Sequence, residues 1–434
     1  MSAATPRPVR RALMASVLTG LIAQAALMVS GVLVARMLGV ENRGALALLI
    51  VGPMLIVFLG GLGLPLATTF EIARNPTIAR PMLRRLRHFV GLQTMILTLL
   101  HGVILVLLVN GRAHEVQVAA VSTIVIIPGA IAFQHGLAVM LGEQRYSEFN
   151  LLKIAPSFVF AAVAVAAFVL DRGTLPLLTA AAAASWLAVG LLTLILAIRG
   201  SEQQEADAAL PDIRQLVRFG ARSMLGSASP SDGAGIEQVV IGLFLSTRAV
   251  GLYVVAAAFM NLSRLVAQSI GFVAYPHVAA HRVAADAERA MWRFAATGVV
   301  AAGVILIALE LVVDHLIVFF FGDGFAPAAG VARILLLAAF FLGARRVLSD
   351  AARGFDKPLA GSVAEAASWA VLIPAMIVLT PLFGLHGVAW ALVLAALTSL
   401  CVIVWRVRKP LPATPPEPEV DLVALPNVVI GRDV

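Results

Sequence analysis

Residues 12–35 read ALMASVLTGLIAQAALMVSGVLVA, an apolar run without a charged side chain. A helix that crosses the hydrocarbon core of a bilayer needs about 20 mostly apolar residues, so this run is long enough for one span. Arg7, Arg10 and Arg11 precede it, as basic residues precede a signal peptide. The run is too long for the apolar part of a signal peptide, and no clear cleavage site follows. We therefore expect a first membrane span with the N-terminus in the cytoplasm.

The composition of the whole chain agrees with this first run. Of its 434 residues, 60% are hydrophobic and 13% are charged, whereas about 25% of the residues in soluble domains are charged. A soluble chain of this length could not bury so much apolar surface around one or two cores. The sequence therefore predicts an all-α polytopic membrane protein with about 12 spans. The apolar runs lie at 12–35, 44–68, 89–110, 116–141, 152–170, 175–198, 218–245, 250–276, 294–321, 329–353, 360–381 and 384–405.

Lysine and arginine residues are divided unequally between alternate connections. Counted loop by loop, 23 lie on the side of the N-terminus and six on the other side. Cytoplasmic loops carry the excess of basic residues, so this asymmetry predicts an even number of spans and two cytoplasmic termini. It also accounts for the net charge of +8 without a nucleic acid partner. The preference for arginine over lysine is typical of a GC-rich bacterial genome, and we expect a bacterial cytoplasmic membrane.

The spans fall into two halves of six, separated by the longest polar connection. Three features recur between the halves at a nearly constant offset of 207 to 212 residues: Gly44 and Gly251, Pro65 and Pro276, Gly142 and Gly354. Parallel repeats of this kind are a transporter architecture with the substrate site between the lobes. We predict a V-shaped, pseudo-two-fold molecule with an N-lobe at 1–199, a cytoplasmic linker at 200–217, a C-lobe at 218–406 and a Pro-rich disordered tail at 407–434.

Polar residues inside the spans concentrate in the second half. The seventh span contains GSASPSDGAG at 226–235, where Pro230 and the nearby glycines predict a kinked or broken helix. Such backbone is tolerated at membrane depth only beside protein or a wet cavity. Asp232 falls near the midplane, Arg222 toward the cytoplasm and Glu237 toward the outside.

The eighth span has Arg264 near its centre. Asn261 and Gln268 share a helix face with it by their spacing, and this polar face should point into the bundle. One interpretation is a structural ion pair between Asp232 and Arg264. The other is that Arg264, with or without Arg222, contacts an anionic head group, because arginine presents a planar fork of donors that matches phosphate oxygens. The two interpretations are compatible.

Other polar residues carry weaker predictions. Gln24 lies near the centre of the first span, where the first lobe has almost no ionisable residue. Glu310 and Asp314 in the ninth span relay protons or line a solvated outer mouth. The residues near the cytoplasmic ends of later spans, Arg345, Arg346 and Glu365, are most simply interfacial charges.

Catalytic and metal-binding patterns are missing from the sequence. The eight histidines have no ligand spacing, and Cys401 is the single cysteine, so we expect neither a metal site nor another cofactor. No Ser-His-Asp set or pair of catalytic carboxylates stands out, and we do not expect an enzyme. No phosphate loop is present, which argues against a primary pump.

Several segments together resemble the multidrug/oligosaccharidyl-lipid/polysaccharide exporter superfamily, in particular its polysaccharide-flippase branch. Each motif is short and apolar, and the specificity comes from their order and spacing over roughly residues 10–405. The segments are ARMLGVENRG at 35–44, LVRFG at 216–220, VVIGLFL at 239–245 with VGLY at 250–253, FGDGF at 321–325 with RIL at 333–335, and PLFGLHGVA at 381–389.

The resemblance implies two six-helix lobes around a central cavity, alternating access, and a lipid-linked saccharide substrate with a polyprenyl diphosphate anchor. Family members line the cavity with cationic residues that meet the diphosphate, and Arg264 and Arg222 are the candidates here, with Gln24, Asn261 and Gln268 beside them. The lipid II flippases carry extra spans and arginines within the first two spans. This chain has Gln24 there instead, which makes lipid II a less expected substrate.

Three functions follow as hypotheses. The first is a flippase for polyprenyl-diphosphate-linked oligosaccharide in cell-surface polysaccharide biosynthesis, with Asp232, Pro230, Glu237 and Glu310 as coupling or gating residues. Membrane lipids and the glycosyltransferases or polymerase of the same pathway would be its partners. The second is a cation-coupled multidrug antiporter, which would need carboxylates in its cavity. The third is a non-transporting scaffold in envelope assembly.

Overall fold

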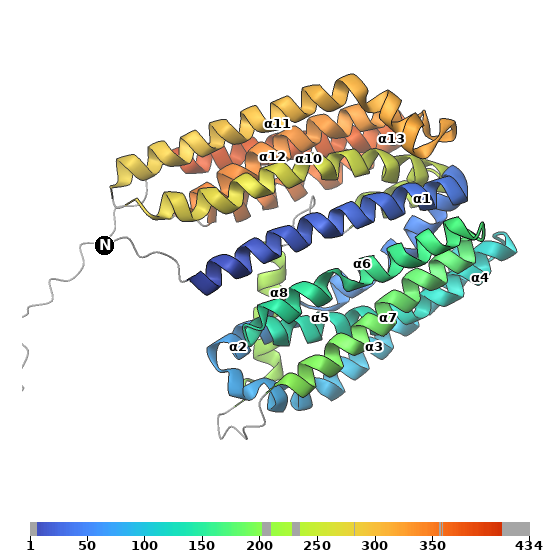
Figure 1. Ribbon diagram of the computed structural model, residues 1–434, viewed down its shortest axis with the longest axis horizontal. Coiled ribbons are helices and arrows are strands. Elements are labelled where there is room, and N and C mark those ends of the chain that lie inside the picture. Colours follow the sequence, from blue (N-terminus) through green and yellow to red (C-terminus); the bar gives the residue numbers. More distant parts are fainter. Residues whose placement is uncertain are drawn as a thin grey trace, which may run out of the picture.

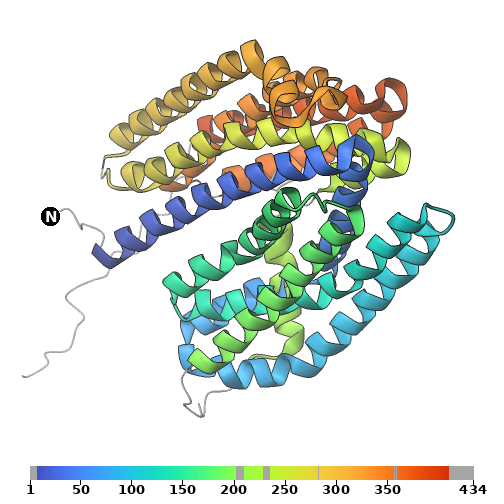
Figure 2. The ribbon, with the colours of Figure 1, turned by 45° about the vertical axis from the view of Figure 1, so that its right-hand side comes forward.

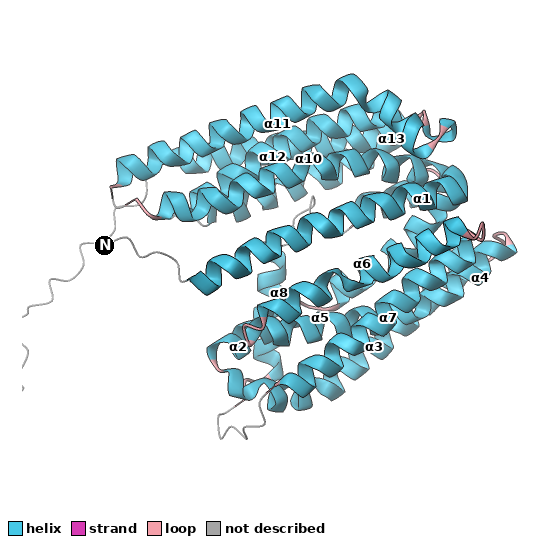
Figure 3. Ribbon diagram, viewed as in Figure 1, coloured by secondary structure: helices cyan, strands magenta, loops and turns pink. Residues whose placement is uncertain are grey.

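The described part of the chain consists of helices and loops without strands (Figure 3). The computed structural model describes residues 7–201, 210–227, 235–281, 283–355, 357 and 359–409. Its elements are α1 (Arg7–Gly60), α2 (Leu64–Arg74), η1 (Pro76–Ile78), α3 (Ala79–Val109), α4 (His114–Ser122), η2 (Thr123–Val125), α5 (Ile126–Gly142), α6 (Tyr146–Val169), α7 (Leu175–Gly200), α8 (Ile213–Ser227), α9 (Ile236–Phe244), α10 (Thr247–Ala279), α11 (Ala284–Phe321), η3 (Asp323–Phe325), α12 (Ala328–Gly354) and α13 (Leu359–Arg408).

Two of these helices, α1 and α13, each hold two of the predicted spans. Non-helical backbone interrupts α1 at Gly39, with φ 68°, and α13 at Gly384, with φ 57°. Glycine adopts such positive φ values without the steric cost that a side chain adds. We call the side of the molecule with these two breaks the turn side. The opposite side, where α1 begins and α13 ends, is the terminal side (Figure 1). In the predicted orientation the terminal side is cytoplasmic.

The expected all-α fold with about twelve membrane helices is confirmed. Span 10 lies in α12 and span 7 in the pair α8 and α9, while the remaining spans lie in helical stretches that are long and apolar enough to cross a membrane. Among the described residues there are eight such stretches: Gln24–Gly60, Pro76–Val109, His114–Gly142, Tyr146–Val169, Leu175–Gly200, Thr247–Ala279, Ala284–Phe321 and Leu359–Arg408.

The helices form two lobes with α1 between them. Figures 1 and 2 show α3 to α7 on one side of α1 and α10 to α13 on the other. Within the first lobe α5 packs against α7, and within the second α12 packs against α10, α11 and α13. The first span, in α1, therefore contacts both lobes. The predicted lobe boundaries stay predictions, and α8 begins at Ile213, inside the predicted linker.

The seventh predicted span is two helices in the described structure. The first, α8, ends at Ser227 and packs against α2 of the first lobe. The second, α9, begins at Ile236 and packs against α1, α10 and α13. Residues 228–234, which include Pro230 and Asp232, lie outside the described residues. The two halves of this span thus belong to different lobes.

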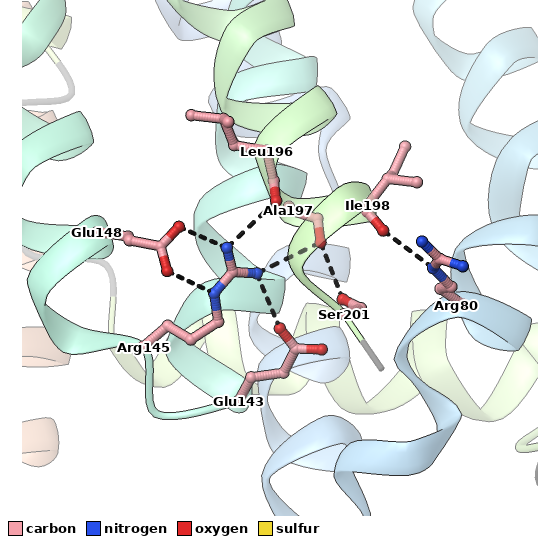
Figure 4. A network of polar contacts seen from close by, with 8 residues as sticks. All are labelled: Arg80, Glu143, Arg145, Glu148, Leu196, Ala197, Ile198 and Ser201. Atoms are coloured by element: carbon pink, nitrogen blue, oxygen red, sulfur yellow. Dashed lines mark hydrogen bonds and ion pairs between the residues drawn. The ribbon is translucent and has the colours of Figure 1, made fainter. Parts of the chain in front are cut away.

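A network of hydrogen bonds around Arg145 joins the loop between α5 and α6 to the end of α7 (Figure 4). The guanidinium donates to Glu148 at 2.8 and 2.5 Å and to Glu143 at 3.1 Å. It also donates to the carbonyl oxygens of Leu196 and Ala197, which lie near the C-terminal end of α7. The hydrogen bond to Glu148 is the main cause that raises the pKa of Arg145 above its ordinary value. The network therefore ties the loop between α5 and α6 to the end of α7.

Candidate functional site

A polar face interrupts the apolar helix α10 at its midpoint. Arg264 lies half-buried near the middle of this helix, and its Nη1 donates to Oδ1 of Asn261 at 3.4 Å. Gln268 follows one turn later and is exposed. Asn261, Arg264 and Gln268 therefore lie along one stretch of α10, as the spacing predicts; the depth of this face in the membrane stays a prediction.

This face of α10 lines a small cavity against α12. The cavity has a volume of ≈ 60 Å³, and its lining residues include three arginines and a glutamine but no acid. Gly343 of α12 lies opposite Ala267 of α10, so that two small residues let the helices approach closely. The lining residues are Arg264, Ala267 and Gln268 from α10 and Leu342, Gly343, Arg345 and Arg346 from α12. The arrangement is a recess lined by arginine and amide hydrogen-bond donors.

The acids near the cavity are engaged by arginines. Arg345 donates through Nη1 to Glu365 of α13, and both side chains are about nine-tenths buried. Asp350 is buried one turn further along α12. It accepts a hydrogen bond from Nε of Arg346 at 3.0 Å and another from Nη1 of Arg353 at 3.2 Å. The carboxylates of Glu365 and Asp350 thus each have an arginine partner, as a buried charge requires.

The interpretation of Arg345 and Glu365 as interfacial charges is wrong, since only 7% and 8% of these residues are exposed. They face each other inside the second lobe. Sequence reasoning missed them because the partner of each lies on another helix. A usable signal was present: Arg345, Arg346 and Asp350 fall within the apolar span at 329–353, where a charged residue is costly and needs a partner.

Five further site residues were predicted in the first and seventh spans, and they do not all lie near Arg264. Gln24 lies half-buried on α1. Arg222 is exposed on α8, whose main contact is with α2 rather than α10. Glu237 on α9 interacts electrostatically with Arg264. Asp232 and Pro230 lie outside the described residues. Of these five residues, Glu237 is the described one for which an electrostatic interaction with Arg264 is found.

Glu310 belongs to a different feature of the second lobe. It lies on α11 with Asp314, and both form ion pairs with Arg333 of α12. Glu310 and Arg333 line an open groove together with Trp390 of α13. This groove shares no lining residue with the α10–α12 cavity. The structure thus separates Glu310 from Arg264.

The lobes touch closely on the turn side. Arg36 of α1 donates through Nε to the carbonyl oxygen of Phe320 at 2.7 Å and through Nη2 to that of Phe319 at 2.6 Å. Gly44 of α1 and Gly251 of α10 pack so tightly that a Cβ atom on Gly44 would lie 1.8 Å from the carbonyl oxygen of Thr247. The described lobes are therefore joined at this side of the molecule.

The N-terminal two thirds of the chain match a known protein family. The family profile, described as "Polysaccharide biosynthesis protein", matches residues 9–281. The chain belongs to this family. A search of curated protein sequences finds no match.

Solved structures show the same fold. The chain is similar to the lipid II flippase MurJ in an inward closed conformation, with a TM-score of 0.70 and 13% identity over 90% of this chain and 87% of that one. It is similar to the MATE multidrug transporter DinF-BH, with a TM-score of 0.62 and 17% identity over 93% and 96%. A MOP superfamily transporter from Pyrococcus furiosus, described as having a binding pocket of reverse polarity, has a TM-score of 0.53 and 14% identity over 88% and 95%.

The family match agrees with the expected polysaccharide branch, and the chain has the fold of solved transporters of the multidrug/oligosaccharidyl-lipid/polysaccharide exporter (MOP) superfamily. At such low identities the solved structures show the fold alone. The protein is a multi-pass membrane protein of the polysaccharide biosynthesis family with the two-lobed transporter fold. The cytoplasmic position of its termini and its bacterial inner membrane stay predictions.

Proposed function

We propose that this protein is a flippase that moves a polyprenyl-diphosphate-linked oligosaccharide across the cytoplasmic membrane by alternating access, for cell-surface polysaccharide biosynthesis. The observation that carries the proposal is the cavity between α10 and α12, which offers three arginines and no acid. The family match to polysaccharide biosynthesis supports it independently. The two-lobed fold supplies the moving parts that alternating access requires.

Arginine is the residue suited to a diphosphate at this depth. Its planar fork donates two parallel hydrogen bonds to phosphate oxygens, and these bonds are stronger where water is scarce. Arg264 and Arg346 would each hold phosphate oxygens, while Gln268 would donate from its amide. The cavity of ≈ 60 Å³ is too small for a saccharide. The glycan would therefore lie outside this cavity, and the prenyl tail would remain in the bilayer.

The rival functions demand different features. A multidrug antiporter for cationic drugs needs acids in its site, and the described acids beside this cavity accept bonds from arginines instead. The MATE-like fold alone does not favour it. Coupling to an ion gradient would use Glu237, which interacts with Arg264, and Asp232. A scaffold without transport would need no recess lined by three arginines between α10 and α12.

A binding experiment with a short-chain probe tests the site. Farnesyl diphosphate should bind the purified protein more tightly than farnesol, and Arg264→Gln should weaken diphosphate binding about 10- to 100-fold, since hydrogen bonds to charged groups contribute about 1.5–3 kcal/mol. Arg333→Gln is the matched control, because Arg333 lies in the other groove. Equal binding of farnesol and farnesyl diphosphate, or equal losses in both variants, would overturn the assignment.

A further inference from the structure

A second cationic feature lies on the terminal side of the C-lobe. Its cavity has a volume of ≈ 640 Å³ and shares no lining residue with the α10–α12 site. The lining comes from the first turns of α11: Ala285, Glu288, Arg289, Trp292, Arg293 and Ala296. We call Arg289, Arg293, Arg408 and Lys409 the basic patch. The central transport site does not use any of these residues.

The arginines of α11 present their charge outward. Arg289 and Arg293 are four residues apart and therefore lie on one helix face. Arg289 donates to Asp286 at 2.5 Å, yet 71% of its side chain stays exposed. Arg293 is exposed, and its guanidinium has no hydrogen bond or ion pair with any described residue. The four cations of the basic patch outnumber the nearby acids, Asp286 and Glu288.

Two tryptophans join the basic patch to the end of α13. The guanidinium of Arg408 lies 5.7 Å from the ring centre of Trp292, and Nζ of Lys409 lies 3.6 Å from that of Trp405. Lys357 donates to the carbonyl oxygens of Val407 and Lys409 and so fixes this end of the helix. Tryptophan beside basic residues is typical of the level of lipid head groups.

An apolar track leads from the basic patch into the membrane. Arg293 is followed on the same face of α11 by exposed apolar side chains at helical spacing. Val300, Val304, Ile307 and Leu311 are each more than 60% exposed. At 1.5 Å per residue, Arg289 and Arg293 lie about 8 and 14 Å from the start of α11. The order along α11 from its start is thus Arg289, then Trp292 and Arg293 at nearly the same depth, and then the exposed apolar side chains.

We propose that the basic patch binds an anionic phospholipid of the leaflet on the terminal side. Arg293 and Arg289 hold the phosphodiester, Trp292 lies beside the glycerol, and one acyl chain follows the apolar track. The surplus of positive charge selects an anionic head group over a zwitterionic one. The apolar track favours a lipid over an acidic protein segment, which would leave Val300 and Val304 uncovered. This site does not depend on the proposed transport function.

Native mass spectrometry of the full-length protein in detergent tests this proposal. Equal amounts of phosphatidylglycerol and phosphatidylcholine are added, and the adducts are counted. The wild-type protein should retain phosphatidylglycerol preferentially, and Arg289→Gln with Arg293→Gln should lower that preference about tenfold. Arg84→Gln is the matched control: Arg84 is an exposed arginine on α3 of the other lobe. It should leave the preference unchanged.

Three outcomes would overturn the proposal. An equal loss in Arg84→Gln would mean that any basic residue attracts the lipid. Displacement of phosphatidylglycerol by inorganic phosphate at equal concentration would mean that the patch recognises a free anion. If the preference appeared only in a chain shortened to end at Ala413, the acidic residues Glu417, Glu419 and Asp421 would be the occupant instead.

Discussion

At the scale of single residues, both lobes pair buried charges, in different places. The N-lobe pairs Glu143, whose side chain is 9% exposed, with Arg145 in the loop after α5, whereas the C-lobe buries Arg345, Asp350 and Glu365 within α12 and α13. Burying an ion pair costs desolvation that its attraction only partly repays. We therefore expect these C-lobe charges to have a role beyond stability. They lie at or beside the Arg264 cavity, and we expect them to hold its lining side chains in place.

The pair of Arg345 and Glu365 gives a first prediction about stability. Glu365→Gln leaves the Arg345 charge without its buried partner, and it should lower the free energy of unfolding by about 3–5 kcal/mol. The double variant Arg345→Met with Glu365→Leu should recover most of that loss, because it removes both charges. Thermal unfolding of the purified protein in detergent measures both effects.

An exposed ion pair serves as the control for that series. Arg85 and Asp212 are 3.9 Å apart with side chains 41% and 54% exposed, so Arg85→Gln should change stability by only about 0–1 kcal/mol. A Glu365→Gln protein as stable as Arg85→Gln would show that the buried pair does not hold the C-lobe together.

Part of the candidate site could be predicted from the sequence and part could not, for a physical reason. Helical spacing alone puts Asn261, Arg264 and Gln268 on one face. The contacts of Arg345 with Glu365 connect residues on two different helices, and periodicity within one span carries no information about which neighbouring helix it meets. Hydropathy also could not decide that Glu310 pairs with Arg333 away from the cavity.

At the scale of helices, the glycines that mark the internal repeat have a second role. Gly44 and Gly251 occupy corresponding positions in the two halves, and in the structure they meet where α1 crosses α10. The carbonyl oxygen of Val40 would lie only 2.0 Å from a Cβ atom on Gly251. The crossing therefore requires glycine on both helices, because backbone atoms cannot yield as a flexible side chain does.

This crossing predicts the effect of adding one methyl group. Gly44→Ala places Cβ 1.8 Å from the carbonyl oxygen of Thr247, so it should push the lobes apart on the turn side and lower stability by about 1–3 kcal/mol. Gly31→Ala is the control on the same helix, because nothing lies within 4 Å of its added Cβ.

Helix propensity sets the expected result for the control. Alanine favours a helix by about 0.8–1 kcal/mol over glycine, so Gly31→Ala should keep or slightly raise the melting temperature. Equal melting temperatures of the two alanine variants would contradict the tight crossing.

The helices of the seventh span also show where sequence reasoning succeeds. Pro230 and the nearby glycines predict an interrupted helix, and α8 and α9 are separate elements that pack in different lobes. The sequence could not indicate that α8 packs against α2, because that contact depends on how the lobes are arranged. The breaks at Gly39 and Gly384 likewise fall within motifs that carry the family resemblance.

At the scale of the whole molecule, composition and the distribution of charge were sufficient for the fold. The apolar runs have the length of membrane spans, and the short connections join neighbouring helices. In a bilayer, few folds other than a helical bundle are compatible with this pattern. The recurring offsets indicated two lobes. The choice of substrate would depend instead on a few side chains such as Arg264. The central claim is that the protein moves a diphosphate-linked glycan across the membrane and that Arg264 binds the diphosphate.

Translocation in proteoliposomes tests that claim most directly. The protein is reconstituted with a fluorescent oligosaccharide on a short polyprenyl diphosphate, and a membrane-impermeant quencher reports how much of the label reaches the outer leaflet. The account predicts translocation by the wild-type protein, loss of it in Arg264→Gln at equal protein level, and normal rates in Arg333→Gln. Wild-type rates no faster than those of protein-free vesicles, or full activity of Arg264→Gln, would contradict it.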